Sequence, residues 1–368
     1  MSDQRRPLIV LTGGGTAGHV SPALALAERL SDRFELVFAG SPYGPEKGLA
    51  LAAGLPFVPV IAAGLARKGL LARGRALAVT GWGLAQAAAH LRRLRPAAVV
   101  GTGGYVSGPV GWAAGQLRVP LYLLEPDARL GVANRLLAGK ARRLFLGFPD
   151  MQDALPEALR RKSIGTGLPV RQAIGRMDSA LARRRLGMAA DKPVLLVFGG
   201  SLGAQALNQL AEKLVASGLG EDVQLIWATG RRYRAQVHTG SLPGRMVVPY
   251  LDDMAGAMAA ADLALTRSGA GTVAELAQAG LPALLVPSPN VSDDQQMENA
   301  RRVAGGGGAL VVEEAALADP DTLVRIVTLL HDRTALAAMS RAIRQAVPAD
   351  AAQRIADILA EDLLEVAP

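Results

Sequence analysis

Short apolar runs, separated by glycine-rich turns and by stretches with helical periodicity, mark the first part of the chain. The runs are Leu8–Leu11, Leu36–Ala39, Phe57–Val60, Ala97–Val100 and Leu121–Leu124. Uninterrupted apolar runs of this length indicate strands that are buried on both faces, as in a parallel sheet. Since helical stretches such as Pro22–Leu30 alternate with the runs, we expect a doubly wound α/β domain.

The same alternation starts again after residue 165. The later runs are Val194–Phe198, Leu225–Ala228, Met246–Val248, Leu263–Thr266 and Ala283–Val286. A length of 368 residues also favours two domains over one. We therefore predict two Rossmann-like parallel-sheet domains, 1–165 and 166–346. The stretch Leu336–Leu364 is helical by periodicity, and its last part, about 347–368, is expected to pack back on the first domain.

The charge is distributed unevenly between the two predicted domains. Residues 1–165 hold 21 Lys and Arg against 10 Asp and Glu, whereas residues 166–368 hold 19 against 22. The basic part predicts an anionic partner, such as phospholipid headgroups or a phosphorylated substrate, although an arginine-rich composition alone could also produce it. Nucleic acid is disfavoured, because only 4% of residues are aromatic and no nucleic-acid motif is present.

The composition and the first residues limit the cellular compartments and the kinds of chemistry that we expect for this chain. The absence of cysteine excludes disulfides, thiolate catalysis and cysteine-ligated metals, and it fits a reducing compartment. The polar start Met1–Pro7 does not resemble a secretory signal. The uncharged stretch Pro96–Leu117 is interrupted by glycines and prolines, so we interpret it as strand, loop and helix instead of a membrane span.

The first glycine-rich turn is GGGTAGH, Gly13 to His19, between a predicted strand and a predicted helix. Backbone N–H groups of such a turn can approach a phosphate closely. The spacing of Gly13, Gly15 and Gly18 also fits a dinucleotide site, but the second strand ends without the carboxylate that would bind the ribose. His19 is a candidate general base, since its pKa lies near neutrality, or alternatively a packing residue of the first helical turn.

Two further turns repeat this arrangement of strand, glycines and helix. They are GTGGYVSGP, Gly101 to Pro109, and GGSLGAQ, Gly199 to Gln205. Their free N–H groups, with the hydroxyl of Ser201, suit a phosphate, while a plain tight crossover is the alternative for the second turn.

The segment Arg267–Ala300 carries a fourth turn and a polar cluster. Glu275 lies one turn into the predicted helix, where it could accept both ribose hydroxyls or simply complement the helix dipole. The cluster offers amides and carboxylates that suit sugar hydroxyls, or forms a solvated helix start. Its members are Asp293, Asp294, Gln295, Gln296 and Asn299.

Together these motifs resemble the MurG glycosyltransferases of peptidoglycan synthesis, over nearly the whole chain. The motifs are GGGTAGHVSPALALAERL, GTGGYVSGP, GLPVR, GGSLGAQALNQ and SGAGTVAELAQAGLPALLVP with DDQQMENA. The resemblance implies a GT-B fold with an interdomain cleft. It further implies inverting transfer of GlcNAc from UDP-GlcNAc to the MurNAc C4 hydroxyl of lipid I, with no metal and no cofactor, by a peripheral protein on the cytoplasmic face of the membrane.

The resemblance also assigns roles to individual residues. His19 corresponds to the proposed general base, Leu251 to the backbone that contacts uracil, and Arg171 to an arginine near the nucleotide. Apart from the resemblance, we expect backbone N–H groups, helix N-termini and Arg267 or Arg171 to meet the charge of the leaving diphosphate, since no metal is expected there. The remaining positions would contact the donor or its phosphates, ribose and GlcNAc: Gly15, Thr16, Ala17, Ser201, Ala270, Gly271, Thr272, Val273, Ala274, Glu275, Gln295 and Gln296.

One site position departs from the family pattern. Asp127 stands where relatives carry an asparagine that contacts donor or acceptor, so this contact is in doubt.

One basic and apolar segment predicts a membrane contact. The segment Leu65–Arg75, with Trp82 nearby, suits anionic headgroups, or is a solvated basic loop. Alternative functions are a UDP-GlcNAc 2-epimerase, a glycolipid synthase acting on diacylglycerol, and a sensor that binds the nucleotide without catalysis.

Overall fold

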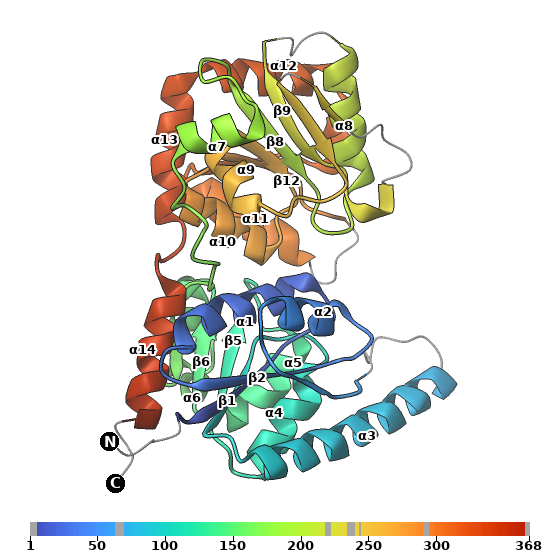
Figure 1. Cartoon of the computed structure of the whole chain (residues 1–368), viewed down its shortest axis with the longest axis vertical. Coiled ribbons are helices and arrows are strands. Elements are labelled where there is room, and N and C mark those ends of the chain that lie inside the picture. Colours follow the sequence, from blue (N-terminus) through green and yellow to red (C-terminus); the bar gives the residue numbers. More distant parts are fainter. Residues whose placement is uncertain are drawn as a thin grey trace. The chain divides into compact units, whose positions relative to one another are not determined.

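The chain folds into two compact units, each built on its own sheet. The computed structural model describes residues 6–62, 70–217, 222–233, 240–242, 244–289 and 294–364. One unit comprises Met1–Arg171 and Asp350–Pro368, and the other Gln172–Ala349. Within each unit, helices cover the sheet (Figure 1).

The first unit contains a seven-stranded sheet in which all strands are parallel, in the order β3-β2-β1-β4-β5-β6-β7. The strands are β1 (Leu8–Thr12), β2 (Glu35–Gly40), β3 (Phe57–Pro59), β4 (Ala98–Gly101), β5 (Leu121–Glu125), β6 (Arg143–Leu146) and β7 (Ser163–Gly165). Central residues such as Val10 and Leu123 are completely buried, which explains the uninterrupted apolar runs. The chain order reverses between β1 and β4, and ligands of open α/β sheets bind at the carboxyl edge of such a reversal.

The last helix of the chain belongs to the first unit, where it packs against α1. Asp362 on this helix accepts hydrogen bonds from Arg143 (Nη2–Oδ1, 2.9 Å) and from the Tyr122 hydroxyl (3.2 Å). The Arg143 guanidinium holds the pKa of Asp362 below its usual range. The helices of this unit are α1 (Ala17–Leu30), α2 (Pro45–Ala52), α3 (Leu70–Leu94), α4 (Ser107–Gln116), α5 (Val132–Leu137), α6 (Glu157–Arg160) and α14 (Ala351–Leu364).

The second unit repeats the plan with the order β10-β11-β9-β8-β12-β13-β14. Only its edge strand β10 is antiparallel, and the reversal of chain order falls between β8 and β12. The strands are β8 (Val194–Phe198), β9 (Gln224–Ala228), β10 (Gly240–Leu242), β11 (Arg245–Val248), β12 (Leu263–Thr266), β13 (Ala283–Leu285) and β14 (Ala309–Val311). The helices are α7 (Ser179–Leu186), α8 (Gln205–Ala216), α9 (Met254–Ala260), α10 (Ala270–Ala279), α11 (Gln295–Gly305), α12 (Pro320–His331) and α13 (Arg333–Gln345).

All strands predicted from apolar runs are present, and the differences lie at the edges and ends. The structure adds β6, β7, β10 and β14, which are only three or four residues long. The predicted helix Leu336–Leu364 is two helices, α13 and α14. They are separated at 346–350, where Pro348 interrupts the hydrogen bonding and Asp350 adopts a φ of 55°.

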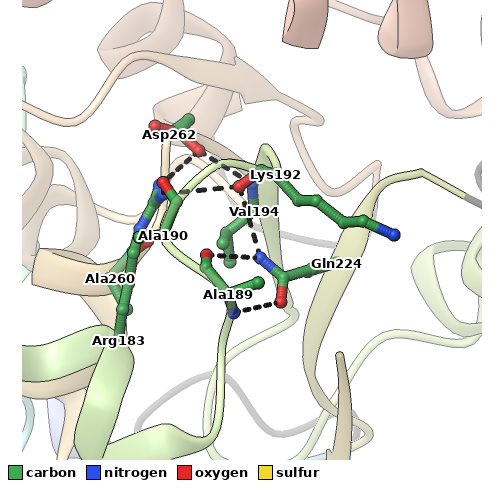
Figure 2. A network of polar contacts seen from close by, with 8 residues as sticks. All are labelled: Arg183, Ala189, Ala190, Lys192, Val194, Gln224, Ala260 and Asp262. Atoms are coloured by element: carbon green, nitrogen blue, oxygen red, sulfur yellow. Dashed lines mark hydrogen bonds and ion pairs between the residues drawn. The ribbon is translucent and has the colours of Figure 1, made fainter. Parts of the chain in front are cut away.

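An ion pair closes the amino edge of the second sheet (Figure 2). Arg183 of α7 pairs with Asp262 just before β12 (Nη2–Oδ2, 2.6 Å), and the same carboxylate oxygen accepts the N–H of Val194 (2.7 Å). The other guanidinium N–H groups donate to the carbonyls of Ala260, Ala190 and Lys192. Arg183 therefore joins α7, the start of β8 and the start of β12.

The amide of Gln224 fixes the loop that enters β8. Its Oε1 accepts the N–H of Ala189 (2.6 Å), and its Nε2 donates to the carbonyls of Ala189 (2.9 Å) and Lys192 (3.2 Å). Gln224 is itself buried. Because each bond is to the backbone, loop 189–192 is held independently of its own side chains.

We expect Arg183→Ala to destabilise the second unit by about 2–4 kcal/mol, because the partly buried Asp262 and three carbonyls lose their partner. Arg185→Ala, on the exposed face of α7, should change stability by less than about 0.5 kcal/mol. Trp227 is the only tryptophan of the second unit, so its fluorescence in a W82F/W112F background reports urea unfolding there. Equal midpoints for the two variants would contradict the assignment.

Candidate active site

The first two glycine-rich turns meet at the carboxyl edge of the first sheet. The N–H of Gly14, after β1, donates to the carbonyl of Gly103, after β4 (3.3 Å). Gly103 and Gly104 have φ values of 91° and 79°, and a Cβ on Gly104 would collide with the carbonyl of Gly14. These positions therefore require glycine both for their dihedral angles and for the close approach of the two backbones.

His19 lies against this pair of turns. Its carbonyl accepts the Thr102 hydroxyl (2.6 Å), and a Cβ on Gly103 would lie 3.1 Å from its Nδ1. Burial lowers the pKa of His19, while the charge of Asp127 and the Thr102 backbone act in the opposite direction. Its Nδ1 is buried and has no hydrogen-bond partner among the described residues. Burial thus favours the neutral form of the imidazole, which is the form that accepts a proton.

The turn after β5 is organised by the buried carboxyl group of Glu125. It accepts the N–H of Asp127 (3.1 Å), the N–H of Gly131 (2.8 Å) and Nδ2 of Asn134 (3.0 Å). Burial raises the pKa of Glu125 to about 7 in spite of these three hydrogen bonds. Asp127, on this turn, is half-buried and close enough to His19 to affect its pKa.

The positions of the first turn that are predicted to contact the sugar-nucleotide donor differ in their surroundings. Thr16 is the exposed N-cap residue of α1, and Ala17 begins the helix. Gly15 has a φ of 93°, and its N–H donates to Oε1 of Glu46 on α2 (2.5 Å). The ring of Tyr105 covers the other side of Gly15. The N–H of Gly15 is therefore occupied by a carboxylate of the same chain.

In the second unit, the turn after β8 packs directly on the turn after β9. A Cβ on Gly203 or on Gly230 would collide with the opposite backbone, and the N–H of Arg231 donates to the carbonyl of Ser201 (3.4 Å). The side chain of Ser201 is exposed, as the prediction requires of a ligand contact. Leu251, after β11, is buried, so only its backbone is suited to contact a base.

The predicted phosphate and ribose positions form the start of α10, next to the reversal of chain order. Gly269 is the N-cap residue, and the first turn contains no acidic residue. Val273 and Ala274 pack inward, whereas Glu275 is half-buried. The predicted positions on this helix are Ala270, Gly271, Thr272, Val273, Ala274 and Glu275.

Gln295 and Gln296 begin α11, which packs against α10. The Gln296 side chain accepts the N–H of Ser288 (2.8 Å), and its carbonyl accepts the Ser268 hydroxyl (2.8 Å). Asn299 donates from Nδ2 to the carbonyl of Ser268 (3.2 Å). Gln296 thus fixes the turns after β12 and β13, while Gln295 is half-buried at the helix start. Asp293 lies outside the described residues.

The two arginines expected near the diphosphate have different surroundings. Arg171 is exposed. Arg267 is largely buried, donates to the carbonyls of Val286 and Pro287, and pairs with Glu314. Arg267 therefore braces the turn after β13 in this structure instead of presenting its guanidinium to a ligand.

Several residues of the first unit were not predicted as site residues. Glu46, Thr102, Tyr105, Glu125 and Asn134 all contact or organise the turns around His19. Glu125 carries a sequence signal, because it is a charged residue at the end of an apolar run. Nothing in the spacing marks Glu46, whose partner Gly15 is 31 residues away, and no motif marks Asn134, which donates to Glu125 in the same turn region.

Within the described ranges, no three or more His, Asp or Glu residues are grouped to hold a metal ion. In the same part of the chain, no helix combines the length and hydrophobicity needed to cross a bilayer.

Two parallel-sheet units with glycine-rich turns at their carboxyl edges are the architecture of GT-B glycosyltransferases. Residues 9–146 match the glycosyltransferase family 28 N-terminal domain, and residues 194–355 match the family 28 C-terminal domain. The crystal structure of Acinetobacter baumannii MurG superposes with a TM-score of 0.72 at 29% identity, covering 97% of this chain and 99% of that one.

Curated relatives extend this similarity over the full length. The UDP-N-acetylglucosamine--N-acetylmuramyl-(pentapeptide) pyrophosphoryl-undecaprenol N-acetylglucosamine transferase of Thermus thermophilus is 42% identical, over 96% of this chain and 99% of its own. The enzyme of the same name from Salinibacter ruber is 39% identical, over 97% of both chains. The chain belongs to the MurG family.

The raised pKa of Glu125 predicts a specific pH dependence of stability. The folded protein holds this proton more tightly than the unfolded chain, so the contribution of Glu125 is fully present below pH 4.5 and is lost as the pH rises through about 7. The loss amounts to about 3 kcal/mol. The free energy of unfolding of the wild type, compared with that of Glu125→Gln, should therefore decrease as the pH rises from 4.5 to 8.

Urea unfolding of both proteins over this pH range measures the effect. All other ionisable groups are common to the two proteins, so the difference in unfolding free energy between them reports on Glu125. A difference that stays constant with pH would contradict the raised pKa.

Proposed function

We propose that this chain transfers GlcNAc from UDP-GlcNAc to the MurNAc C4 hydroxyl of lipid I and forms lipid II, with inversion and without a metal ion. The proposal is supported by the 42% identity to a transferase of this name over almost the whole chain. The structural observation that carries it is the half-buried His19 at the carboxyl edge of the first sheet, packed against the turns after β1 and β4 beside Thr102 and Gly103.

The first unit would bind the acceptor and supply the base. His19 takes the proton of the attacking hydroxyl while the oxygen forms its bond to the anomeric carbon. The bond from that carbon to the β-phosphate oxygen breaks on the opposite face, and UDP leaves with the electron pair. A neutral imidazole suits this step, and its low pKa is a consequence of burial.

The second unit would bind UDP-GlcNAc. The helices α8 and α10 follow glycine-rich turns and carry no acidic residue in their first turns, so their N–H groups and dipoles favour the diphosphate. Glu275 lies one turn further along α10, at the place expected for the ribose hydroxyls. Gln295 and Gln296 would contact GlcNAc, with Gln296 held by Ser288. The backbone at Leu251 would contact uracil, and Ser201 the phosphates.

We further propose that the first unit binds an anionic membrane surface on the cytoplasmic side. The segment 63–69 lies outside the described residues, but α3, α4 and α5 pack side by side and expose large apolar side chains. These include Trp82, 64% exposed, and Trp112, 41% exposed. Lys140 lies over the Trp112 ring at 4.8 Å, which places a cation beside an exposed aromatic, as at a membrane interface.

The test of the reaction is UDP release from UDP-GlcNAc with and without a soluble lipid I analogue. We expect release only with the acceptor. His19→Ala should lower kcat by about 10²- to 10⁴-fold because the proton acceptor is lost, while the KM for UDP-GlcNAc stays unchanged. His90→Ala, on α3, is the matched control and should retain activity.

Other outcomes identify the alternatives. Release of UDP without acceptor would indicate an epimerase, and release with diacylglycerol a different glycolipid synthase. Binding of UDP-GlcNAc without release under any condition would indicate a sensor. Near-normal turnover of His19→Ala would refute the assignment of the base.

Membrane binding is tested by co-sedimentation with vesicles containing anionic phospholipid. The double variant W82S/W112S should bind at least about tenfold more weakly than the wild type, because two apolar contacts are removed. Val324→Ser, an equally exposed apolar position on α12, should bind normally. Binding that is insensitive to the double substitution, to anionic lipid and to salt would exclude this surface.

A further inference from the structure

The turn after β9 places an arginine at the carboxyl edge of the second sheet. Gly230 of this turn packs on Gly203 of the turn after β8 so closely that neither position has room for a Cβ. The N–H of Arg231, the next residue, donates to the carbonyl of Ser201 (3.4 Å). The backbone of Arg231 is therefore fixed beside the turn that leads into α8, whose start carries no acidic residue and no side-chain cap.

The side chain of Arg231 contacts the turn on the other side, after β11. Its Cζ lies 4.5 Å from the centre of the Tyr250 ring. The sheet order β11-β9-β8 places the turn after β9 between the turns after β11 and β8, and all three strands are parallel. Tyr250 immediately precedes Leu251, the position proposed for uracil, whereas Ser201 is the position proposed for the phosphates. Arg231 thus joins the turns on which the base and the phosphates are expected.

The charge of Arg231 is available to a ligand. The side chain is exposed, and no described carboxylate forms an ion pair with it. A cation–π contact orients a guanidinium but does not neutralise it, so the forked N–H donors remain suited to a phosphate. Arg267, in contrast, is committed to Glu314 and to two backbone carbonyls. A guanidinium is charged at any pH near neutrality, so its protonation state is not in question.

We propose that Arg231 binds the diphosphate of the sugar nucleotide, in the role expected from the sequence for Arg267 or Arg171. Its N–H groups would donate to phosphate oxygens bound at the start of α8, and Tyr250 keeps the side chain at this edge. Free UDP at pH 8 carries about one more negative charge than UDP-GlcNAc, so the arginine favours the departing group over the intact donor. The identity of the nucleotide rests on the proposed function, whereas the contact with a diphosphate is tested by binding alone.

Competition binding of uridine, UDP-GlcNAc and UDP to the full chain at pH 8 tests the contact. Arg231→Ala should bind uridine as the wild type does, UDP-GlcNAc about tenfold more weakly and UDP more weakly still, because the loss follows the negative charge of the ligand. Arg231→Lys should regain part of the affinity, since it keeps the charge without the planar fork.

Arg232→Ala is the matched control, because it removes the same charge from the neighbouring exposed position. Its affinity for all three ligands should stay within about twofold of the wild type, since the predicted contact belongs to the side chain that lies over Tyr250. A loss in this variant as large as in Arg231→Ala would show a general effect of charge and would overturn the assignment.

Two other results would contradict the role of Arg231. Wild-type affinity of Arg231→Ala for UDP would show that the arginine does not contact the diphosphate. An equal loss for uridine and UDP would show that the substitution only disturbs the turn. Either result leaves the proposed function intact if the wild type transfers GlcNAc. A loss that follows ligand charge, in a chain that transfers nothing with any acceptor, would instead support Arg231 and refute the proposed function.

Discussion

The close contact between two backbones at the carboxyl edge of the first sheet is the constraint on which the candidate site depends. Gly14 donates to the carbonyl of Gly103, and Gly104 leaves no space for a side chain above Gly14. The contact exists because β1 and β4 are neighbours at the reversal of chain order, so that their following turns face each other. His19 packs against these glycines, and its partial burial lowers the pKa of the imidazole.

Three carboxyl groups lie in or hold the turns near that imidazole, and each has a different role. Glu125 holds the turn after β5 through three donors, and the turn carries Asp127, whose charge counteracts the effect of burial on the pKa of His19. Glu46 holds the turn after β1. The charge of Asp127 therefore raises the pKa of His19 against the effect of burial, which the uncharged amide of an asparagine would not do.

The sequence predicts the central strands and the glycine-rich turns well, because both-face burial leaves uninterrupted apolar runs and turns need glycine. Short edge strands such as β14 lack such runs, and the break before α14 depends on Asp350 adopting a left-handed conformation. His19 is found because it is one of four histidines and closes a turn. Glu46 is not, since its partner Gly15 is 31 residues away and the pairing depends on how α2 packs against α1 and β2.

The two units differ in what meets the N–H groups of their glycine-rich turns. In the second unit, α8 and α10 begin without an acidic residue in the first turn and without a side-chain cap, so their N–H groups favour an anion. In the first unit, the side chain of Glu46 accepts the N–H of Gly15. A ligand phosphate at Gly15 would have to displace this side chain, whereas the starts of α8 and α10 carry no such acceptor.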